Sequence, residues 1–257
     1  MKRFFGQFKN CLLCAVVVLL LTASLCACSS TGTGNNSSTD LPETVTPTAV
    51  PPTEVPTPTL GFRDPTVTGV SGYAETGIPK VNGDRASVWK LAPTYWIENT
   101  VKGDAGLTVA EFRVLWDDDY LYVQVHILDS TYDTSSNSVY ERDSVFFFIN
   151  EDGKKNRVYS VGDACYIVDR DGNGYLGSGA SGDRYHCTSY SDGTRNGYFV
   201  EASIPLLTIT GRYDRQIGFD VRVNNASEGK LRQMLQWSDT DTHTDVTMRG
   251  VGLLTLD

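Results

Sequence analysis

The stretch that decides the fold is EFRVLWDDDYLYVQVHILDSTYDTSSNSVYERDSVFFFIN, residues 111–150. It contains three apolar runs, each of which alternates with other side chains, separated by two polar connections. The alternating apolar residues of the middle run are Leu121, Val123, Val125 and Ile127. A period of two places such residues on one face of a β-strand. The acidic link 117–120 has the length of a hairpin turn, and 129–142 reads as a surface loop with two tyrosines.

Strand candidates of the same kind continue toward the C-terminus. They are residues 156–161, 164–168, 184–190, 198–204, 216–224, 231–237 and 251–256. Gly- and Asp-containing turn signals separate them, and only residues 85–91 suggest a helical turn or two. Many short strands at this spacing predict an all-β fold, a two-sheet antiparallel β-sandwich over residues 69–257.

Residues 1–27 have the composition of an export signal. A basic start precedes the apolar run 11–21, which is too short for a convincing membrane span. The segment ends in LCACSS, residues 25–30, which resembles a bacterial lipobox. We therefore predict a lipoprotein signal peptide with lipidation of Cys28, in preference to plain secretion with soluble release.

The mature chain is strongly acidic. Removing the three positive charges of the signal takes the formal net charge from −9 to −12. Such a surface argues against nucleic acid as a partner and against electrostatic binding to anionic lipid. The predicted membrane contact is therefore the acyl chain. The expected location is the outer face of a bacterial cytoplasmic membrane, exposed at the cell surface.

Residues 28–68 form a Ser/Thr/Pro-rich linker. The run PETVTPTAVPPTEVPTPT, residues 42–59, lacks large apolar side chains and cannot bury a core. Such a composition predicts a disordered, extended segment with polyproline-like character. Its simplest role is a spacer between the membrane and the folded domain.

Two of the six cysteines fall in the predicted domain. Cys165 and Cys187 lie in strand candidates joined by a Gly-rich link. An exported compartment permits a disulfide between neighbouring strands. Two buried free thiols are the alternative, and the sequence leaves both open.

A series of short blocks carries a family resemblance. In chain order they are VNGD (81–84) with Trp89, VLWD (114–117), YLYV (120–123), Asp129, ERDSV (141–145), GYFVEA (197–202), IP (204–205), IGFDV (217–221), VN (223–224), WSD (237–239) and Gly252. Together they resemble carbohydrate-binding module family 9, found in xylanases and other polysaccharide-degrading proteins. The resemblance implies an antiparallel β-sandwich, and it gives Trp89, Trp116, Trp237 and Asp143 structural roles.

The resemblance also implies where a sugar would bind. The well-known members hold a terminal sugar between two tryptophans, with charged and amide side chains at its hydroxyls. Tyr140 stands at the first tryptophan position, and Asp245, with His243 close by, stands near the second. Phe146 replaces a glutamate of those members, and Ile167 lies near the position of an arginine. The carbohydrate-binding residues that we predict are Tyr140, Arg142, His243 and Asp245.

One motif suggests a cation. Asp169, Asp171 and Asn173 begin a D-x-D-x-N-G sequence, in which alternating side-chain oxygens converge on calcium. Ala180 stands at the twelfth position, where such loops have a glutamate. Because the family resemblance implies structural calcium, these three residues are candidate calcium ligands. A tight polar hairpin is the alternative. The three histidines have no metal-ligand spacing, so no zinc site is predicted.

The predicted function is that of a membrane-tethered extracytoplasmic lipoprotein. It would bind xylan- or cellulose-type polysaccharide or oligosaccharide in support of carbohydrate catabolism, beside cell-surface glycosidases, and tethering would raise its effective concentration. A xylanase-like glycoside hydrolase, or an accessory subunit of one, is the alternative, but we expect no activity of its own, since no nucleophile elbow or zinc motif appears. A haem sandwich would need axial ligands, for which Met234, Met248 and His126 are the candidates. An adhesion or scaffold sandwich without sugar binding also stays open.

Overall fold

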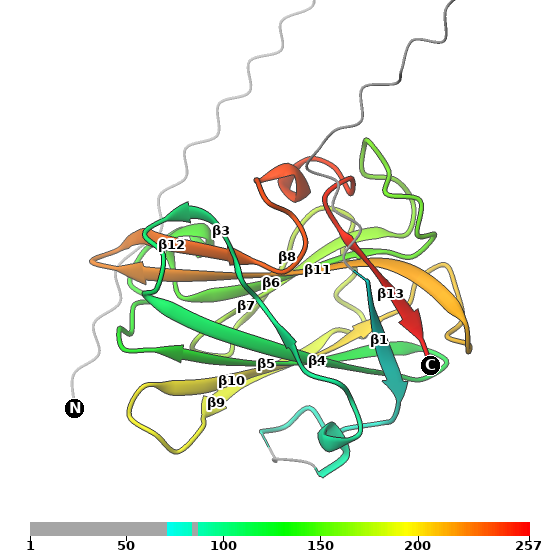
Figure 1. Ribbon diagram of the computed structural model, residues 1–257, viewed down its shortest axis with the longest axis horizontal. Helices are drawn as coiled ribbons and strands as arrows, with labels where there is room; N and C mark the ends of the chain where they lie inside the picture. The colour runs from blue at the N-terminus through cyan, green and yellow to red at the C-terminus, as the bar shows by residue number, and fades with distance from the viewer. Residues whose placement is uncertain (1–70, 84–86) are drawn as a thin grey trace, which may run out of the picture. The chain divides into compact units, whose positions relative to one another are not determined.

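The computed structural model describes residues 71–83 and 87–257, and in this part the backbone forms 13 strands and three short 3-10 helices (Figure 1). The strands are β1 (Ser71–Thr76), β2 (Tyr95–Trp96), β3 (Asn99–Gly103), β4 (Thr108–Trp116), β5 (Tyr120–Asp129), β6 (Ser144–Asn150), β7 (Asp163–Asp169), β8 (Gly174–Leu176), β9 (His186–Ser191), β10 (Gly197–Pro205), β11 (Arg215–Ser227), β12 (Lys230–Gln236) and β13 (Gly252–Leu256). The 3-10 helices are η1 (Ser87–Lys90), η2 (Val139–Glu141) and η3 (His243–Asp245). The predicted signal peptide, linker and Cys28 lie outside the described residues.

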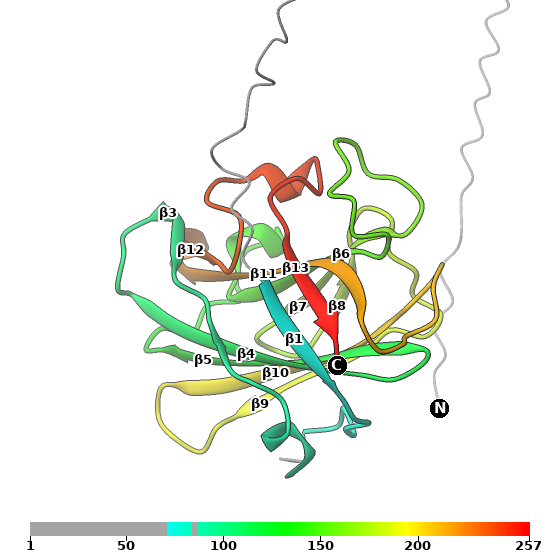
Figure 2. The ribbon, with the colours of Figure 1, turned by 45° about the vertical axis from the view of Figure 1, so that its right-hand side comes forward.

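The strands form two facing layers. Sheet A has the order β8-β7-β6-β11-β13, with β12 beside β11 and β3 beside β12. Sheet B has the order β4-β5-β10-β9, with β2 beside β4. Strand β1 joins the two layers, since Ser71–Ala74 pair with β13 and Glu75 and Thr76 pair with β4 (Figures 1 and 2). The predicted β-sandwich is confirmed. Both pairings of β1 are parallel, unlike those of the other strands in the described ranges.

The decisive stretch forms β4, β5 and β6, as its alternation predicts. The middle apolar set is fully buried; its members are Leu121, Val123, Val125 and Ile127. The acidic link is a hairpin turn, because the Asp117 carboxylate accepts hydrogen bonds from the backbone N–H groups of Asp119 and Tyr120, at 2.9 and 2.8 Å. A carboxylate that satisfies its own turn explains why this acidic run joins two strands.

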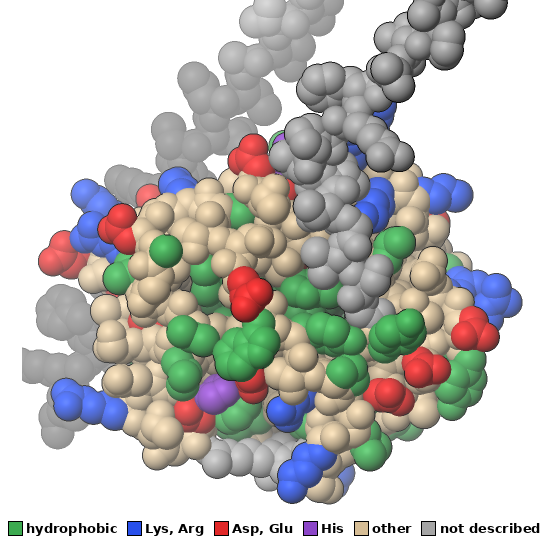
Figure 3. Space-filling view, in the orientation of Figure 1, with side chains coloured by type: hydrophobic (Ala, Val, Ile, Leu, Met, Phe, Trp, Pro, Cys, Tyr) green, Lys and Arg blue, Asp and Glu red, His purple; other side chains and the backbone are tan. Residues whose placement is uncertain are grey.

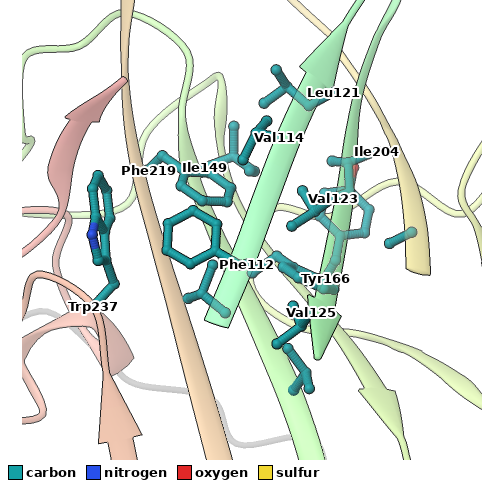
Figure 4. Packing of buried hydrophobic residues seen from close by; sticks show 14 of the residues in the cluster. Phe112, Val114, Leu121, Val123, Val125, Ile149, Tyr166, Ile204, Phe219 and Trp237 are labelled. Carbon is teal, nitrogen blue, oxygen red and sulfur yellow. The ribbon is translucent and has the colours of Figure 1, made fainter. Parts of the chain in front are cut away.

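The core lies between the two sheets. Figure 4 shows side chains of β4 and β5 meeting those of the opposite layer. The Phe112 ring lies 5.7 Å from Phe219 and 5.2 Å, edge-on, from Trp237. Trp89, Trp116 and Trp237 are buried, which confirms their structural roles. Removing a buried aromatic side chain of this kind costs about 3–5 kcal/mol.

One predicted strand is wrong. Residues 156–161 form an irregular loop, in which Val158 and Val161 are 73% and 87% exposed. The Asp163 carboxylate accepts hydrogen bonds from the Asn156 side chain and the Ser160 backbone N–H, at 3.2 and 2.8 Å. The loop therefore satisfies its polar groups locally, and its apolar side chains find no sheet to cover.

The connection between β5 and β6 is held by Asp143. Its buried carboxylate accepts hydrogen bonds from the backbone N–H groups of Ala226 and Asp133, at 2.7 and 2.9 Å, and from the Arg170 guanidinium at 3.1 Å. Burial raises the pKa of Asp143 to about 6. This long loop is thus tied to β11 and to the β7–β8 hairpin, which gives its two tyrosines defined positions.

The two cysteines of the domain are both free thiols, so the disulfide alternative is not formed. Cys165 belongs to an apolar cluster on the outer side of sheet A, whereas Cys187 in β9 packs against the core between the sheets. Adjacent strand residues point to opposite faces, and the odd-numbered position of Cys165 on β7 turns its sulfur away from the core. The described residues contain no helix of the length and apolarity that a membrane span requires.

Candidate functional site

The outer side of sheet A carries a second apolar layer. Strand β6 turns Phe146 and Phe148 away from the core, where they join Cys165 and Ile167 of β7. Met248, from the segment that precedes β13, covers these side chains, and its backbone N–H donates to the Asn156 carbonyl at 2.8 Å. The two connections before β7 and before β13 therefore meet over this side of the sheet.

Arg222 of β11 is fully buried in this layer. Its guanidinium carbon lies 5.6 Å from the Phe146 ring centre and 5.0 Å from that of Phe148. The nitrogens donate hydrogen bonds to three acceptors: Gln236 Oε1 at 3.2 Å, Asp245 Oδ1 at 2.5 Å and Thr244 Oγ1 at 2.9 Å. A buried guanidinium needs such partners, so Arg222 fixes η3 against the sheet.

Tyr140 lies at the edge of the same layer. Its ring centre is 5.2 Å from that of Phe146, yet the residue is 51% exposed. Its carbonyl accepts a hydrogen bond from Asn224 Nδ2 at 3.1 Å. Burial of one side of the ring raises the Tyr140 pKa, and Asp245 and Arg222 shift that pKa in opposite directions. Tyr140 is thus an exposed ring with an apolar base and charged neighbours.

Asp245 and His243 are positioned by a buried acidic scaffold. The Asp239 carboxylate contacts His243 Nδ1 at 2.9 Å and accepts a hydrogen bond from the Thr244 N–H at 2.9 Å. Asp239 itself is held through its N–H by the Asp220 carboxylate, and burial raises the pKa of Asp220 to about 7. The Asp245 side chain remains 38% exposed. Its carboxylate and the Tyr140 ring therefore both reach the surface.

We call Tyr140, Phe146, Arg222, His243 and Asp245 the Tyr140 patch. Of the four predicted sugar-binding residues, Tyr140 and Asp245 are near enough to interact electrostatically, and His243 belongs to the same 3-10 helix as Asp245. The fourth, Arg142, points to the neighbouring hairpin, where Nη1 donates to Asp169 Oδ2 at 3.1 Å and to Tyr175 Oη at 2.8 Å. Sequence reasoning missed Arg222. The only sequence signal for Arg222 is that this polar residue alternates with the core residues of β11, on the other face of the strand. In most strands a polar residue at such a position points to solvent.

The three candidate calcium ligands do not converge. The Asp169 carboxylate is occupied by Arg142, Tyr175 and Asn173, which reaches it with Nδ2, a donor. Asp171 instead accepts from Thr134 Oγ1 at 2.7 Å. The residues therefore do not fit a calcium ion in this arrangement, and among the described side chains no group of three or more His, Cys, Asp or Glu residues is arranged to hold a metal. Calcium binding by the protein stays a prediction.

Exposure by itself does not single out Tyr140. Tyr73, Trp96 and Tyr213 are also exposed, and Figure 3 shows separate hydrophobic patches on the face that it presents, with basic side chains mostly near the rim. Tyr140 differs in what surrounds it. The apolar Phe146 ring packs against it, and the Asp245 carboxylate, which pairs with a buried arginine, is near enough to raise the Tyr140 pKa. Such a combination of ring and directional polar groups suits a ligand with an apolar face and hydroxyl edges.

Comparison with known proteins identifies the class and then the family. The fold is that of carbohydrate-binding modules, since it superimposes on a family 9 module of Caldicellulosiruptor kristjanssonii in complex with cellotriose, with a TM-score of 0.67. That match has 22% identity and covers 73% of this chain and 94% of the other. A family model described as "Carbohydrate family 9 binding domain-like" matches residues 81–256. The chain belongs to this family.

Two enzymes and one more solved structure are also similar to this chain. The chain is 32% identical over 182 residues to endo-1,4-beta-xylanase C of Paenibacillus barcinonensis, and 33% identical over 181 residues to exoglucanase XynX of Acetivibrio thermocellus. Each match covers 70% of this chain but only 16% of the relative. A putative carbohydrate-binding protein of Bacteroides uniformis shares the fold, with a TM-score of 0.55 at 11% identity over 74% of this chain and all of the other.

Proposed function

We propose that the protein binds oligosaccharides or polysaccharides of the xylan and cellulose type at the Tyr140 patch. The observation that carries the proposal is the half-exposed Tyr140 ring, which packs against Phe146 and lies within electrostatic range of Asp245. Membership of a carbohydrate-binding family supports it, as do relatives named as xylanases and a neighbour solved with cellotriose.

The chemistry of the patch suits a pyranose ring. The C–H groups of a sugar face pack on the exposed side of Tyr140, and the hydroxyls at its edge need directional partners. Asp245 supplies an acceptor, and the Arg222 guanidinium holds one of its oxygens in place.

A single patch of this kind gives modest affinity, and attachment of the protein to a surface would compensate for that weakness. We propose that lipidation of Cys28 and the linker 28–68 hold the domain at the bacterial surface, where it retains polysaccharide for glycosidases in support of carbohydrate catabolism. The motif at residues 25–30 and the Pro/Thr-rich composition support this part of the proposal. Attachment to a surface raises the effective concentration of weak binding sites.

The test is binding of the purified domain to xylan and cellulose-derived oligosaccharides, by affinity electrophoresis and calorimetry. We expect Tyr140→Ala to weaken binding by roughly threefold to tenfold, the value of an aromatic contact. Tyr213→Ala is the matched control, because Tyr213 is 62% exposed and lies outside the patch. Absence of binding by the wild-type protein to every glycan would refute the proposal and favour a scaffold role.

A further inference from the structure

A second polar and aromatic feature lies at the open edge of the sandwich. A cavity of about 360 Å³ is formed where the β7–β8 hairpin meets the β9–β10 hairpin, and its wall includes Tyr132, Arg170, Asp171, Arg195 and Tyr198. Its volume is in the range of small-molecule sites, roughly 300–1,000 Å³. The function proposed above makes no use of it.

Tyr132 forms a rigid platform in this wall. The Arg170 guanidinium carbon lies 4.8 Å from the centre of the Tyr132 ring, and the Tyr132 hydroxyl donates a hydrogen bond to Asp171 Oδ1. Even so, Tyr132 is 61% exposed. Because one face of the ring is supported and its hydroxyl is held, little side-chain freedom remains to be lost when a ligand packs on the open part.

The Arg170 side chain is held by ion pairs and by a second aromatic ring. Its Nη1 lies 3.3 Å from Asp129 Oδ2 and 3.1 Å from Asp143 Oδ2, and its other ring contact is Tyr198, 4.3 Å from the guanidinium carbon. The positive charge of Arg170 behind the cavity is therefore more than offset by two buried carboxylates, which does not favour an anion. The Tyr198 hydroxyl is buried and has no hydrogen-bond partner within residues 71–83 and 87–257.

The wall thus combines a supported ring with both donors and acceptors. Arg195 offers N–H donors, Asp171 offers a carboxylate, and Thr194 can do both. A neutral ligand with many hydroxyls matches such a mixture better than a charged or purely apolar one. A sugar residue is the ligand class that uses ring and polar groups together.

A continuous series of contacts connects this cavity with the Tyr140 patch. Arg142 follows Tyr140 by two residues and bonds to Asp169, whose Oδ1 accepts a hydrogen bond from the Asp171 N–H at 3.1 Å. Asp171 in turn holds Tyr132. Tyr132 and Tyr140 both lie on the connection between β5 and β6, and both are exposed.

We propose that the Tyr132 cavity is a further carbohydrate subsite, which binds a sugar residue of the same chain beyond the one at Tyr140. The proposal rests on the function proposed above and adds to it. The protein would then bind a longer oligosaccharide more tightly than a disaccharide, because the contact at the cavity forms only once the sugar chain is long enough to reach it.

The experiment compares Tyr132→Ala, Tyr132→Phe, Tyr140→Ala and the control Tyr213→Ala on a cello-oligosaccharide and a xylo-oligosaccharide series, from the disaccharide to the hexasaccharide. Calorimetry gives the dissociation constants, and thermal unfolding checks that each variant is folded. We expect Tyr132→Ala to weaken binding of the longest oligosaccharides by roughly threefold to tenfold and to leave the disaccharide unchanged. Tyr132→Phe keeps the ring and should retain most of the affinity for long chains.

The outcomes separate the two proposals. If the wild-type protein binds, Tyr140→Ala weakens binding, and Tyr132→Ala matches Tyr213→Ala at every length, the subsite is refuted and the function stands. A loss with Tyr132→Ala that is equal at all lengths also refutes the subsite, since it reports a change at the Tyr140 patch. If the wild-type protein binds no member of either series, the proposed function fails and the subsite fails with it.

Discussion

Replacement of Arg222 by methionine is the sharpest test of how the Tyr140 patch is built. Methionine fills much of the volume between the Phe146 and Phe148 rings but donates no hydrogen bond. Gln236 Oε1 would be left as a buried acceptor without its partner, which costs about 1–3 kcal/mol. Loss of the guanidinium from two aromatic rings costs about 0.5–2 kcal/mol more.

The loss of the guanidinium costs less at Asp245, because this carboxylate is partly exposed. Its side chain is 38% exposed, so water can replace the guanidinium, and we assign no further cost to it. The total is a loss of about 3 kcal/mol in the free energy of unfolding. Because Asp245 and Thr244 would lose their anchor, η3 should become mobile and glycan affinity should fall in the same variant.

Urea unfolding, followed by tryptophan fluorescence, measures the change in the free energy of unfolding. The matched control is Arg232→Met. Arg232 forms an exposed pair with Glu228 at 3.0 Å, and exposed pairs contribute about 0.2–1 kcal/mol. A free energy for Arg222→Met within about 1 kcal/mol of wild type, with an unchanged slope, would show that the buried guanidinium does not hold this layer together.

Two further predictions concern titration and thiol chemistry. Burial raises the pKa of Asp143 from its ordinary value of 3.8 to about 6, so the folded state binds this proton more tightly than the unfolded state. The stability that this pKa shift contributes is fully present below pH 3.8 and is lost as the pH rises through about 6. We expect Asp143→Asn to make the melting temperature less dependent on pH between these two values. A pH profile of the melting temperature equal to that of the wild type would contradict the prediction. Burial raises the pKa of the Cys165 thiol to about 12, so iodoacetamide should label Cys187 before Cys165 in the native protein. In denaturant it should label both. If neither cysteine is labelled in denaturant without reductant, the two form a disulfide.

Local pattern was enough for the strands and for several structural residues. A period of two is set by backbone geometry over a few residues, so the alternation in 111–150 identified β4, β5 and β6 and their buried faces. The role of Asp143 in holding its loop was also predictable, because the family blocks marked it and a carboxylate satisfies nearby N–H groups. Alternation fails where the pattern is short and polar groups pair locally, as in residues 156–161.

Alternation says which side chains share a face, but not whether that face is covered. Arg222 has the parity of a solvated residue, and only the fold brings Gln236, Thr244 and Asp245 around it. The same holds for the opposite directions of Cys165 and Cys187, and for β1, which joins both layers by parallel pairing. The sequence by itself therefore determined a β-sandwich with an exposed Tyr140 loop. The tertiary structure decided what supports Tyr140, because the supporting groups come from strands and connections far apart in the chain.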